Sequence, residues 1–438
     1  MAIIRTYTSY IQHFSMQSMR NWKTVFHGKL CREKTRYSGL PKICMRGLAW
    51  ALTLTVFLIS ETPDAWAQQN TDAFLKRFWA VAGKAGVRRE IFNEALSGFT
   101  PDPKIIAHTH KQSEFVRPIW MYIDDALSKG RLQRGKSVAQ KWQKTFDGVE
   151  KKYKVPRSAI LGIWGMESNF GSFSGKTPTI RALATLAYER YRDDFFWHQL
   201  VDALLIIQSD NLDPAMMVGS WAGAMGQVQF MPSSFRKYAV DYDGDGIKNI
   251  WSSVPDSLAS AANYLHQHGW NSALPWGFEV QLPDGFDFRN YRHDFSVWSK
   301  MGLRRINGKP LPKKGEARIF APAGVQGPIF LLTENFDVIK TYNFSDSYAL
   351  GVLLLGDQLV GRPVLVRHWP RSEKQLDHKE RIELQKRLHD LGLYDDKFDG
   401  RHGTKTRDAV RQFQLKFGYV ADGYPNEGIL QALRKARQ

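Results

Sequence analysis

Apolar residues recur at every third or fourth position over most of the chain, which is the period of an amphipathic α-helix. The pattern predicts helices over 71–86, 136–153, 179–208 (two in succession) and 256–269. Strand-like alternation is confined to three stretches, 277–283, 317–324 and 327–343. We therefore expect residues 68–361 to form a mainly α, α+β domain with one small sheet.

The pattern changes after residue 361. Residues 362–378 are rich in charge and contain two prolines, so we interpret them as a linker with no core of its own. Residues 379–438 return to helical spacing in three short stretches, 380–392, 404–418 and 426–435. Turn sequences separate these stretches, and we expect a second, small three-helix domain.

The beginning of the chain has the pattern of an export signal. An apolar run at 47–60 follows Arg46, and Ala65 and Ala67 follow in the spacing of a cleavage site. The run is too short to span a bilayer. We expect cleavage after Ala67 and, because Met45 alone would open a leader of ordinary length, translation from Met45.

Composition narrows the class of protein. The 438 residues carry a net charge of +18, and loss of the leader, 1–67, with its nine Lys/Arg and three Asp/Glu, would leave +12. Cys31 and Cys44 both precede the cleavage site, so the mature chain would have neither disulfides nor a thiol nucleophile. A basic, exported protein points to an anionic envelope surface or cell-wall polymer and away from nucleic acid. We expect a soluble, monomeric, periplasmic protein without a stable membrane span.

A single acid, Glu167, lies in the apolar sequence GIWGMESNFG. Helical phasing from Pro156 places Ile163 and Trp164 on the same face, so Glu167 would emerge beside the core at the end of a helix. Burial would favour its neutral form and suit it to general acid catalysis. The alternative is an ordinary solvated glutamate at a helix end.

Small and amide-bearing residues crowd the stretch from Gly219 to Phe235, GSWAGAMGQVQFMPSSF. Small residues permit close approach of the backbone, and hydroxyl and amide groups suit sugar hydroxyls. A tightly packed helix junction would show the same composition.

The sequence DYDGDGIKNIWS has the spacing of a calcium loop. Asp241, Asp243 and Asp245 occupy positions 1, 3 and 5, and Ile247 would offer its carbonyl oxygen at position 7. Ser252 stands at position 12, where a carboxylate normally completes the site. We expect weak Ca²⁺ binding, or a loop held only by Asp side chains in turns.

These motifs, together with YAVDYDGDGIKNIW and ANYLHQHGW, resemble the lytic murein transglycosylase B family in order and spacing. Residues 379–435 are similar to a three-helix peptidoglycan-binding domain, down to Asp399–Gly400 and Asp422–Gly423. The resemblance implies a lysozyme-like catalytic domain that acts on the bond between N-acetylmuramic acid (MurNAc) and N-acetylglucosamine (GlcNAc). It also implies a metal-binding loop at Asp241 and no cofactor for the chemistry.

Matched position by position, the resemblance implies the residues of the site. Glu167 falls on the catalytic glutamate of the family, and the remaining matches are residues that line the sugar subsites: Ser220, Gln229, Tyr342, Asn343 and Tyr348. For the two tyrosines, a role in packing is the alternative.

The implied reaction is a lyase step, since no second acid in these motifs takes the part that a glycosidase usually gives to a nucleophile or base. Glu167 would first protonate the glycosidic oxygen and then deprotonate the 6-hydroxyl of MurNAc, which closes to a 1,6-anhydro sugar. A muramidase that uses water, or a non-catalytic wall-binding protein, would fit the same sequence. The small domain is expected to hold the enzyme on peptidoglycan and to be dispensable for chemistry on short glycans.

Overall fold

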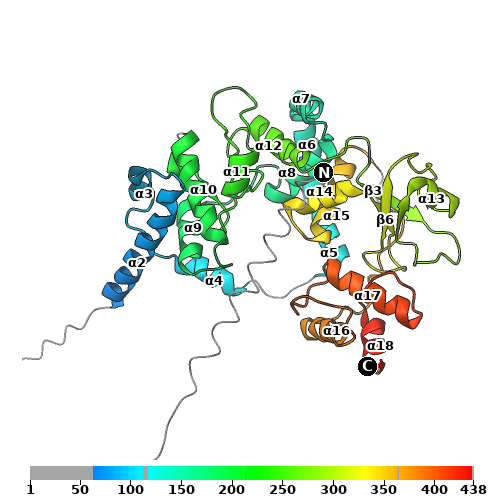
Figure 1. Cartoon of the computed structure of the whole chain (residues 1–438). Coiled ribbons are helices and arrows are strands. Elements are labelled where there is room, and N and C mark those ends of the chain that lie inside the picture. Colours follow the sequence, from blue (N-terminus) through cyan, green and yellow to red (C-terminus); the bar gives the residue numbers. More distant parts are fainter. Residues whose placement is uncertain (1–62, 112–116, 211, 363–364, 437–438) are drawn as a thin grey trace, which may run out of the picture. The chain divides into compact units, whose positions relative to one another are not determined.

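The computed structural model describes residues 63–111, 117–210, 212–362 and 365–436 (Figure 1). The proposed start at Met45, both cysteines and the apolar run of the leader lie outside the described residues. The proposed cleavage site falls within the first described helix, α2 (Pro63–Lys84). Within the described ranges, no helix combines the length and apolar character needed to cross a membrane.

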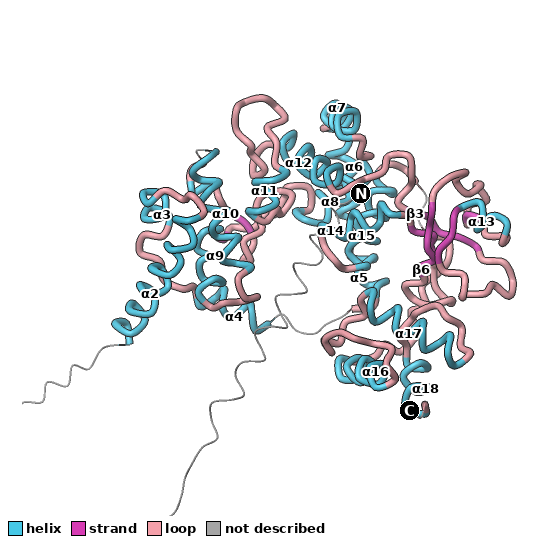
Figure 2. Tube along the Cα trace, viewed as in Figure 1, coloured by secondary structure: helices cyan, strands magenta, loops and turns pink. Residues whose placement is uncertain are grey.

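Helices dominate the part of the chain up to residue 361, as predicted (Figure 2). They are α2, α3 (Arg89–Ala95), α4 (Pro103–Lys111), α5 (Ile119–Ala126), α6 (Lys129–Lys141), α7 (Gln143–Tyr153), α8 (Arg157–Ser168), α9 (Thr179–Tyr188), α10 (Phe195–Asp210), the 3₁₀ turn η1 (Pro214–Met216), α11 (Pro232–Tyr238), α12 (Val254–Gln267), α13 (Phe295–Lys300), α14 (Glu334–Tyr342) and α15 (Asp346–Leu359). The long pattern at 179–208 is indeed two helices, α9 and α10.

One antiparallel sheet of five strands has the order β4-β6-β7-β3-β5. Its strands are β3 (Gly277–Gln281), β4 (Arg292–Asp294), β5 (Arg304–Arg305), β6 (Glu316–Phe320) and β7 (Phe330–Leu332). Alternate residues of β6, Ala317 and Ile319, are buried in a separate small core with Trp298 and Leu331. Two further strands, β1 (Thr177–Pro178) and β2 (Val218–Gly219), pair near the candidate site.

The predicted strand 327–343 is wrong beyond Leu332, because the chain turns there into helix α14. Thr333 caps this helix, accepting a hydrogen bond from the Asn335 amide at 3.3 Å. Glu334 in the first turn suits the positive end of the helix dipole. Buried Phe336 and Ile339 have helical spacing, a signal that the preceding apolar run obscured.

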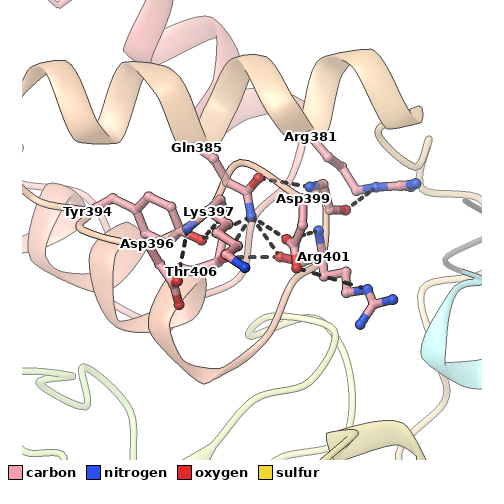
Figure 3. A network of polar contacts seen from close by, with 9 residues as sticks. Arg381, Gln385, Tyr394, Asp396, Lys397, Asp399, Arg401 and Thr406 are labelled. Carbon is pink, nitrogen blue, oxygen red and sulfur yellow. Dashed lines mark hydrogen bonds and ion pairs between the residues drawn. The ribbon is translucent and has the colours of Figure 1, made fainter. Parts of the chain in front are cut away.

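The C-terminal residues form three helices, as predicted: α16 (His378–Asp390), α17 (Thr404–Phe417) and α18 (Glu427–Lys435). Their core includes Leu384, Phe413 and Leu430. Figure 3 shows the polar network that fixes the turn between α16 and α17 around Gln385. The Gln385 amide donates to Asp399 Oδ1 at 3.1 Å and accepts from the Gly400 amide at 2.8 Å.

The described part of the expected linker is anchored to the rest of the protein. The amides of Val366 and Arg367 donate to the buried carboxylate of Glu279 at 2.7 and 2.9 Å. Arg371 donates two hydrogen bonds to Asp124, and Leu376 is buried in the core of the three-helix domain. The segment predicted to be a linker with no core of its own is thus held by contacts with residues on both sides of it in the sequence.

Helices α8 and α15 pack against each other at two glycines, Gly162 and Gly356. A Cβ atom added to Gly162 of α8 would lie 2.1 Å from the Val352 carbonyl oxygen of α15. Reciprocally, a Cβ on Gly356 of α15 would lie 1.9 Å from the Ser158 carbonyl oxygen. The two backbones therefore approach as closely as they do only because both positions lack a side chain.

Replacing Gly162 by alanine should therefore destabilise the protein by about 2 kcal/mol or more, since overpacking outweighs the gain in helix propensity. Urea denaturation measures the change. Gly130→Ala is the matched control: this helical glycine has nothing within 4 Å of an added Cβ, and the substitution should stabilise by up to about 1 kcal/mol. Equal effects of the two substitutions would contradict the packing argument.

Candidate active site

Glu167 lies at the end of the largely buried helix α8, as the sequence predicted. The helix begins after Pro156, and Ile163 and Trp164 are fully buried. It ends in a tight turn in which Asn169 and Phe170, with φ of 49° and 61°, both adopt the left-handed conformation. Left-handed backbone is costly for residues other than glycine, and such strain is often found at functional sites.

The Glu167 side chain is partly exposed to solvent, but its carboxyl group is surrounded by protein atoms. Burial raises its pKa from 4.5 to about 7, and a hydrogen bond donated by the Tyr348 hydroxyl to Oε1 opposes part of this shift. A group with this pKa is available in both the acid and the base form near neutrality.

Three tyrosines from three helices surround this carboxyl group: Tyr122 of α5, Tyr342 at the end of α14, and Tyr348 of α15. Burial, with a contribution from the nearby Glu167 charge, raises the pKa of Tyr122 to about 12 and the pKa values of the other two well above 10. All three phenols therefore keep their protons and can donate hydrogen bonds. Burial is the main cause of the raised pKa of Glu167, and the hydrogen bond from Tyr348 opposes it.

The segments 171–175 and 219–230 are in backbone contact next to α8. A Cβ on Gly175 would lie 2.0 Å from the Gly219 carbonyl oxygen. The side-chain amide of Gln229 donates to the carbonyl oxygens of Ser174 and Gly226, each at 2.9 Å, and Gln229 itself has a φ of 49°. Gln229 thus joins the two segments, and among the described residues its Oε1 has no donor.

Ser220 and Gln227 are also fixed by internal hydrogen bonds. The Ser220 hydroxyl accepts from the Ala224 amide at 3.1 Å and shapes the turn that follows β2. Gln227 is buried, and its Oε1 accepts from the indole N–H of Trp164 at 3.0 Å. The packed-junction interpretation of this stretch therefore holds at Gln227, which connects it to the helix of Glu167.

A cavity of about 1630 Å³ opens beside the site. Its lining includes Tyr122, Met166, Tyr342 and Asn343, and the three-helix domain contributes a further part of the lining. The structure thus places the predicted residues Tyr342 and Asn343 in a cavity wall. Tyr342 donates to the Val228 carbonyl oxygen at 2.6 Å, and the Asn343 side chain accepts from the Ser345 amide. Glu167, Ser220, Gln229 and Tyr348 are not among the lining residues of this cavity.

The acidic loop brings together Asp241, Asp243 and Asp256, whose carboxylate oxygens lie within 4.8 Å of one another. Asp256 is buried at the start of α12, and burial raises its pKa against the effect of three backbone hydrogen bonds. Asp245 is outside this group and accepts a hydrogen bond from the Ile247 amide at 2.8 Å. Clustered carboxylates repel each other, and an oxygen-rich set of this kind fits a hard cation such as Ca²⁺.

Three residues of these sites escaped prediction. Tyr122 lies in a helix with no motif, and its approach to Glu167 results from packing between distant segments. Gln227 was seen only as one amide in a polar stretch. Asp256 follows the twelve-residue loop, and its sequence pattern predicts only the first turn of a helix, where it does lie.

Comparison with known proteins gives matches along most of the chain. Residues 70–357 match the family "Transglycosylase SLT domain", and residues 377–433 match "Putative peptidoglycan binding domain". Over 245 residues, the chain is 34% identical to membrane-bound lytic murein transglycosylase B of Escherichia coli. That alignment covers 54% of this chain and 66% of the relative, so it falls just short of two thirds of the relative's length.

Solved structures show the same similarity. SltB3 of Pseudomonas aeruginosa, in complex with NAG-anhNAM-pentapeptide, matches with a TM-score of 0.78 and 42% identity over 84% of this chain and all of that one. The E. coli lytic transglycosylase SLT35 in complex with calcium matches with a TM-score of 0.55 and 30% identity over 66% of this chain and 92% of that one.

The raised pKa of Glu167 predicts a pH-dependent stability. Because the folded-state pKa lies above the unfolded value, the carboxyl costs no stability below pH 4.5, and the cost grows until pH passes about 7. Glu167→Gln should thus stabilise the protein at pH 8, by at most about 3 kcal/mol, and have little effect at pH 4. Denaturation at both pH values tests this.

The exposed glutamate Glu94 provides the matched control. Glu94→Gln should change the free energy of unfolding by well under about 1 kcal/mol at either pH. A stabilisation by Glu167→Gln that is the same at pH 4 and pH 8 would show that burial does not raise its pKa.

Proposed function

This chain belongs to the transglycosylase SLT family of lytic enzymes, and we propose that it cleaves the MurNAc–GlcNAc bond of peptidoglycan and leaves 1,6-anhydro-MurNAc ends. The observation that carries the proposal is the half-buried Glu167, with a pKa of about 7 and a tyrosine hydroxyl as its polar partner. A single carboxyl that exchanges its proton near neutral pH can serve both halves of the reaction.

In the first half, protonated Glu167 donates its proton to the glycosidic oxygen, and the bond from that oxygen to C1 of MurNAc breaks. The Tyr348 hydroxyl stabilises the carboxylate that forms, because its hydrogen bond favours the charged state. In the second half, the carboxylate takes the proton of the MurNAc 6-hydroxyl as that oxygen bonds to C1. Glu167 is then protonated again, and no water is consumed.

The sugar subsites are proposed at Ser220, Gln229, Tyr342 and Asn343, whereas Tyr348, expected among them, is proposed as the hydrogen-bond partner of Glu167. Gln229 supports this assignment with an acceptor oxygen that no described residue engages, and Tyr342 and Asn343 support it by lining the large cavity. The relative SltB3 binds NAG-anhNAM-pentapeptide and NAG-NAM-pentapeptide, which are peptidoglycan fragments of the kind that we propose as product and substrate.

The protein is further proposed to be exported through its leader, 1–67, and to act as a monomer in the periplasm, with the segment 379–438 binding peptidoglycan. The family match of residues 377–433 supports that binding role. The N-terminal residue of the exported protein, which should be Gln68, tests the leader.

Glu167→Gln should reduce turnover of purified sacculi by about 10²–10⁴-fold, since the substitution removes the only proposed acid and base. Mass spectrometry of the wild-type products should show anhydro ends, which are lighter than reducing ends by one water. Glu94→Gln serves as the control and should retain full activity.

The alternatives give different products. Reducing ends alone would identify a muramidase that uses water on the same fold, and binding of sacculi without any turnover by the wild type would identify a wall-binding protein. Undiminished turnover by Glu167→Gln would rule out Glu167 as the acid.

The acidic loop is proposed to hold a weakly bound Ca²⁺ ion. The sequence suggested Asp241, Asp243, Asp245 and the Ile247 carbonyl as ligands, and the geometry adds the buried Asp256. The calcium complex of the relative SLT35 supports a cation in this family. The ion would tie the loop to the start of α12 and takes no part in the reaction.

Calcium should raise the melting temperature by a few degrees over that in EDTA, as binding to the folded state alone adds about 2.7 kcal/mol at 100 times Kd. Asp243→Asn should abolish the shift, and Asp245→Asn, outside the carboxylate cluster, should retain most of it. Identical melting in calcium and in EDTA would refute the site, and a larger loss with Asp245→Asn would favour the ligands suggested by the sequence.

A further inference from the structure

The three-helix domain contacts the segment that carries two of the tyrosines around Glu167. This segment runs from Lys340 at the end of α14, through the turn at 343–345, to Tyr348 in the first turn of α15. The described residues all fall in one compact unit, and the domain reaches this segment through the side chains of Thr404 and Arg407 of α17.

The first contact is an ion pair that the domain completes. Lys340 Nζ lies 2.6 Å from Asp346 Oδ1 and donates to the Thr404 hydroxyl at 2.9 Å. The side chains of Lys340 and Asp346 are only 15% and 12% exposed. The ion pair between Lys340 and Asp346 thus closes the turn between α14 and α15, and the Thr404 hydroxyl accepts a further hydrogen bond from the ammonium group. We call Lys340, Asp346, Thr404 and Arg407 together the clasp.

The second contact places a buried guanidinium beside the same carboxylate. Arg407 Nε lies 4.0 Å from Asp346 Oδ2, whereas Lys340 contacts the other carboxylate oxygen, Oδ1. Arg407 is also held by the carbonyl oxygen of Pro322, to which it donates at 2.9 Å, and by the ring of Phe320. Its position is therefore defined by the catalytic domain as much as by α17.

Other contacts show that the docking is not confined to this point. Arg411 donates to the carbonyl oxygens of Phe288 and Arg289 at 2.9 and 3.1 Å. In the opposite direction, the Val325 amide donates to Asp422 Oδ2 at 3.1 Å. The three-helix domain thus contacts the catalytic domain through several hydrogen bonds besides those near Asp346.

We propose that the docked C-terminal domain is a positioning element for catalysis, in which Arg407 and Thr404 hold the Lys340–Tyr348 segment so that Tyr342 and Tyr348 stay in place around Glu167. Asp346 lies two residues before Tyr348, whose hydroxyl donates to Glu167, and Lys340 lies two residues before Tyr342. A shift of the clasp therefore moves both hydroxyls. The proposal rests on the proposed function, and it replaces the expectation that the domain is dispensable for chemistry on short glycans.

The charge balance explains why the contact matters. Asp346 is a partly buried anion between two cations, Lys340 and Arg407, and removal of one member of such a group leaves the others without full compensation. The turn can relieve this imbalance by shifting toward solvent. Small displacements of a group that orients the reacting carboxyl are costly to rate, because the geometry must already be close to that of the transition state.

The test uses full-length Arg407→Met, which keeps the apolar stem and removes the charge. Activity is measured on a short glycan without stem peptides, and binding to sacculi is measured separately. We expect kcat to fall about tenfold with KM little changed. Lys416→Met, which removes a charge from an exposed position of the same helix, is the matched control and should behave like the wild type.

The pH profile separates positioning from a general loss of stability. Tyr348 lowers the pKa of Glu167, so weakening its hydrogen bond should raise that pKa and move the basic limb of kcat/KM to higher pH. The groups that face Glu167 are Tyr122, Tyr342 and Tyr348, all protonated in this range. A lower melting temperature with an unchanged kcat and pH profile would mean that the contact is structural only, and would overturn the proposal.

Thr404→Val and Asp346→Asn provide a decision even if Arg407→Met does not fold. Thr404→Val removes one hydroxyl from the clasp without changing volume and should lower kcat about twofold, with the same direction of pH shift. In a double-mutant cycle, Asp346→Asn and Thr404→Val, which both act on Lys340, should be non-additive in kcat, whereas Asp346→Asn and Lys416→Met should be additive. Wild-type kcat for all three clasp variants would refute the proposal.

Glu167→Gln is assayed in parallel, so that the two proposals fail separately. If Glu167→Gln is inactive and Arg407→Met is unaffected, positioning by the domain is wrong and the proposed reaction stands. If Glu167→Gln remains active, the proposed reaction itself is wrong.

Discussion

The close packing of α8 against α15 is the constraint on which the site depends. Gly162 and Gly356 let each helix backbone touch a carbonyl oxygen of the other. This contact brings the last turn of α8, with Glu167, next to the first turn of α15, with Tyr348. The acid and its hydrogen-bond donor lie 181 residues apart in the sequence, so only the crossing of these two helices can join them. A side chain at either glycine would separate the helices and with them Glu167 and Tyr348.

The same packing raises the pKa of the Glu167 carboxyl group and thereby lowers the stability of the fold at neutral pH. An apolar helix end raises the pKa of Glu167 to about 7 at a cost in folding free energy above pH 4.5. The Tyr348 hydroxyl reduces this cost without adding a charge, because it remains protonated and donates a hydrogen bond to the carboxylate. A lysine or arginine in place of Tyr348 would lower the pKa further and leave too little of the acid form at neutral pH. The phenol of Tyr348 thus leaves both the acid and the base form of Glu167 populated near neutral pH.

Local patterns predicted the helices at 71–86, 179–208 and 256–269, the burial of Glu167 and the position of the acidic loop, since these depend on neighbours in sequence. The helix at 334–342 was missed because its apolar positions follow directly on strand β7, and period-two and period-four patterns overlap there. Asp256 was missed as a member of the acidic cluster because loop folding, and not spacing, brings it to Asp243. Tyr122 and Arg407 were beyond prediction for the same reason, since each acts through a contact between segments more than 40 residues apart. The contacts of the linker with the buried Glu279 and the exposed Asp124 could not be predicted from its polar composition, because both partners are distant in sequence.

The three-helix domain contains the same hydrogen-bonded turn twice, and the two copies have different surroundings. Gln414 binds the turn at Asp422 and Gly423 with the same hydrogen bonds that Gln385 makes to Asp399 and Gly400. The two glycines even share their left-handed backbone, with φ of 67° and 69°. Only the second copy uses its aspartate to accept the Val325 amide of the catalytic domain, while the first lines the large cavity. The two turns are alike in sequence, so their sequences do not explain why one contacts the catalytic domain and the other lines the cavity. The difference arises because helix α17 faces the catalytic domain. The residues of α17 that contact it are Thr404, Arg407 and Arg411.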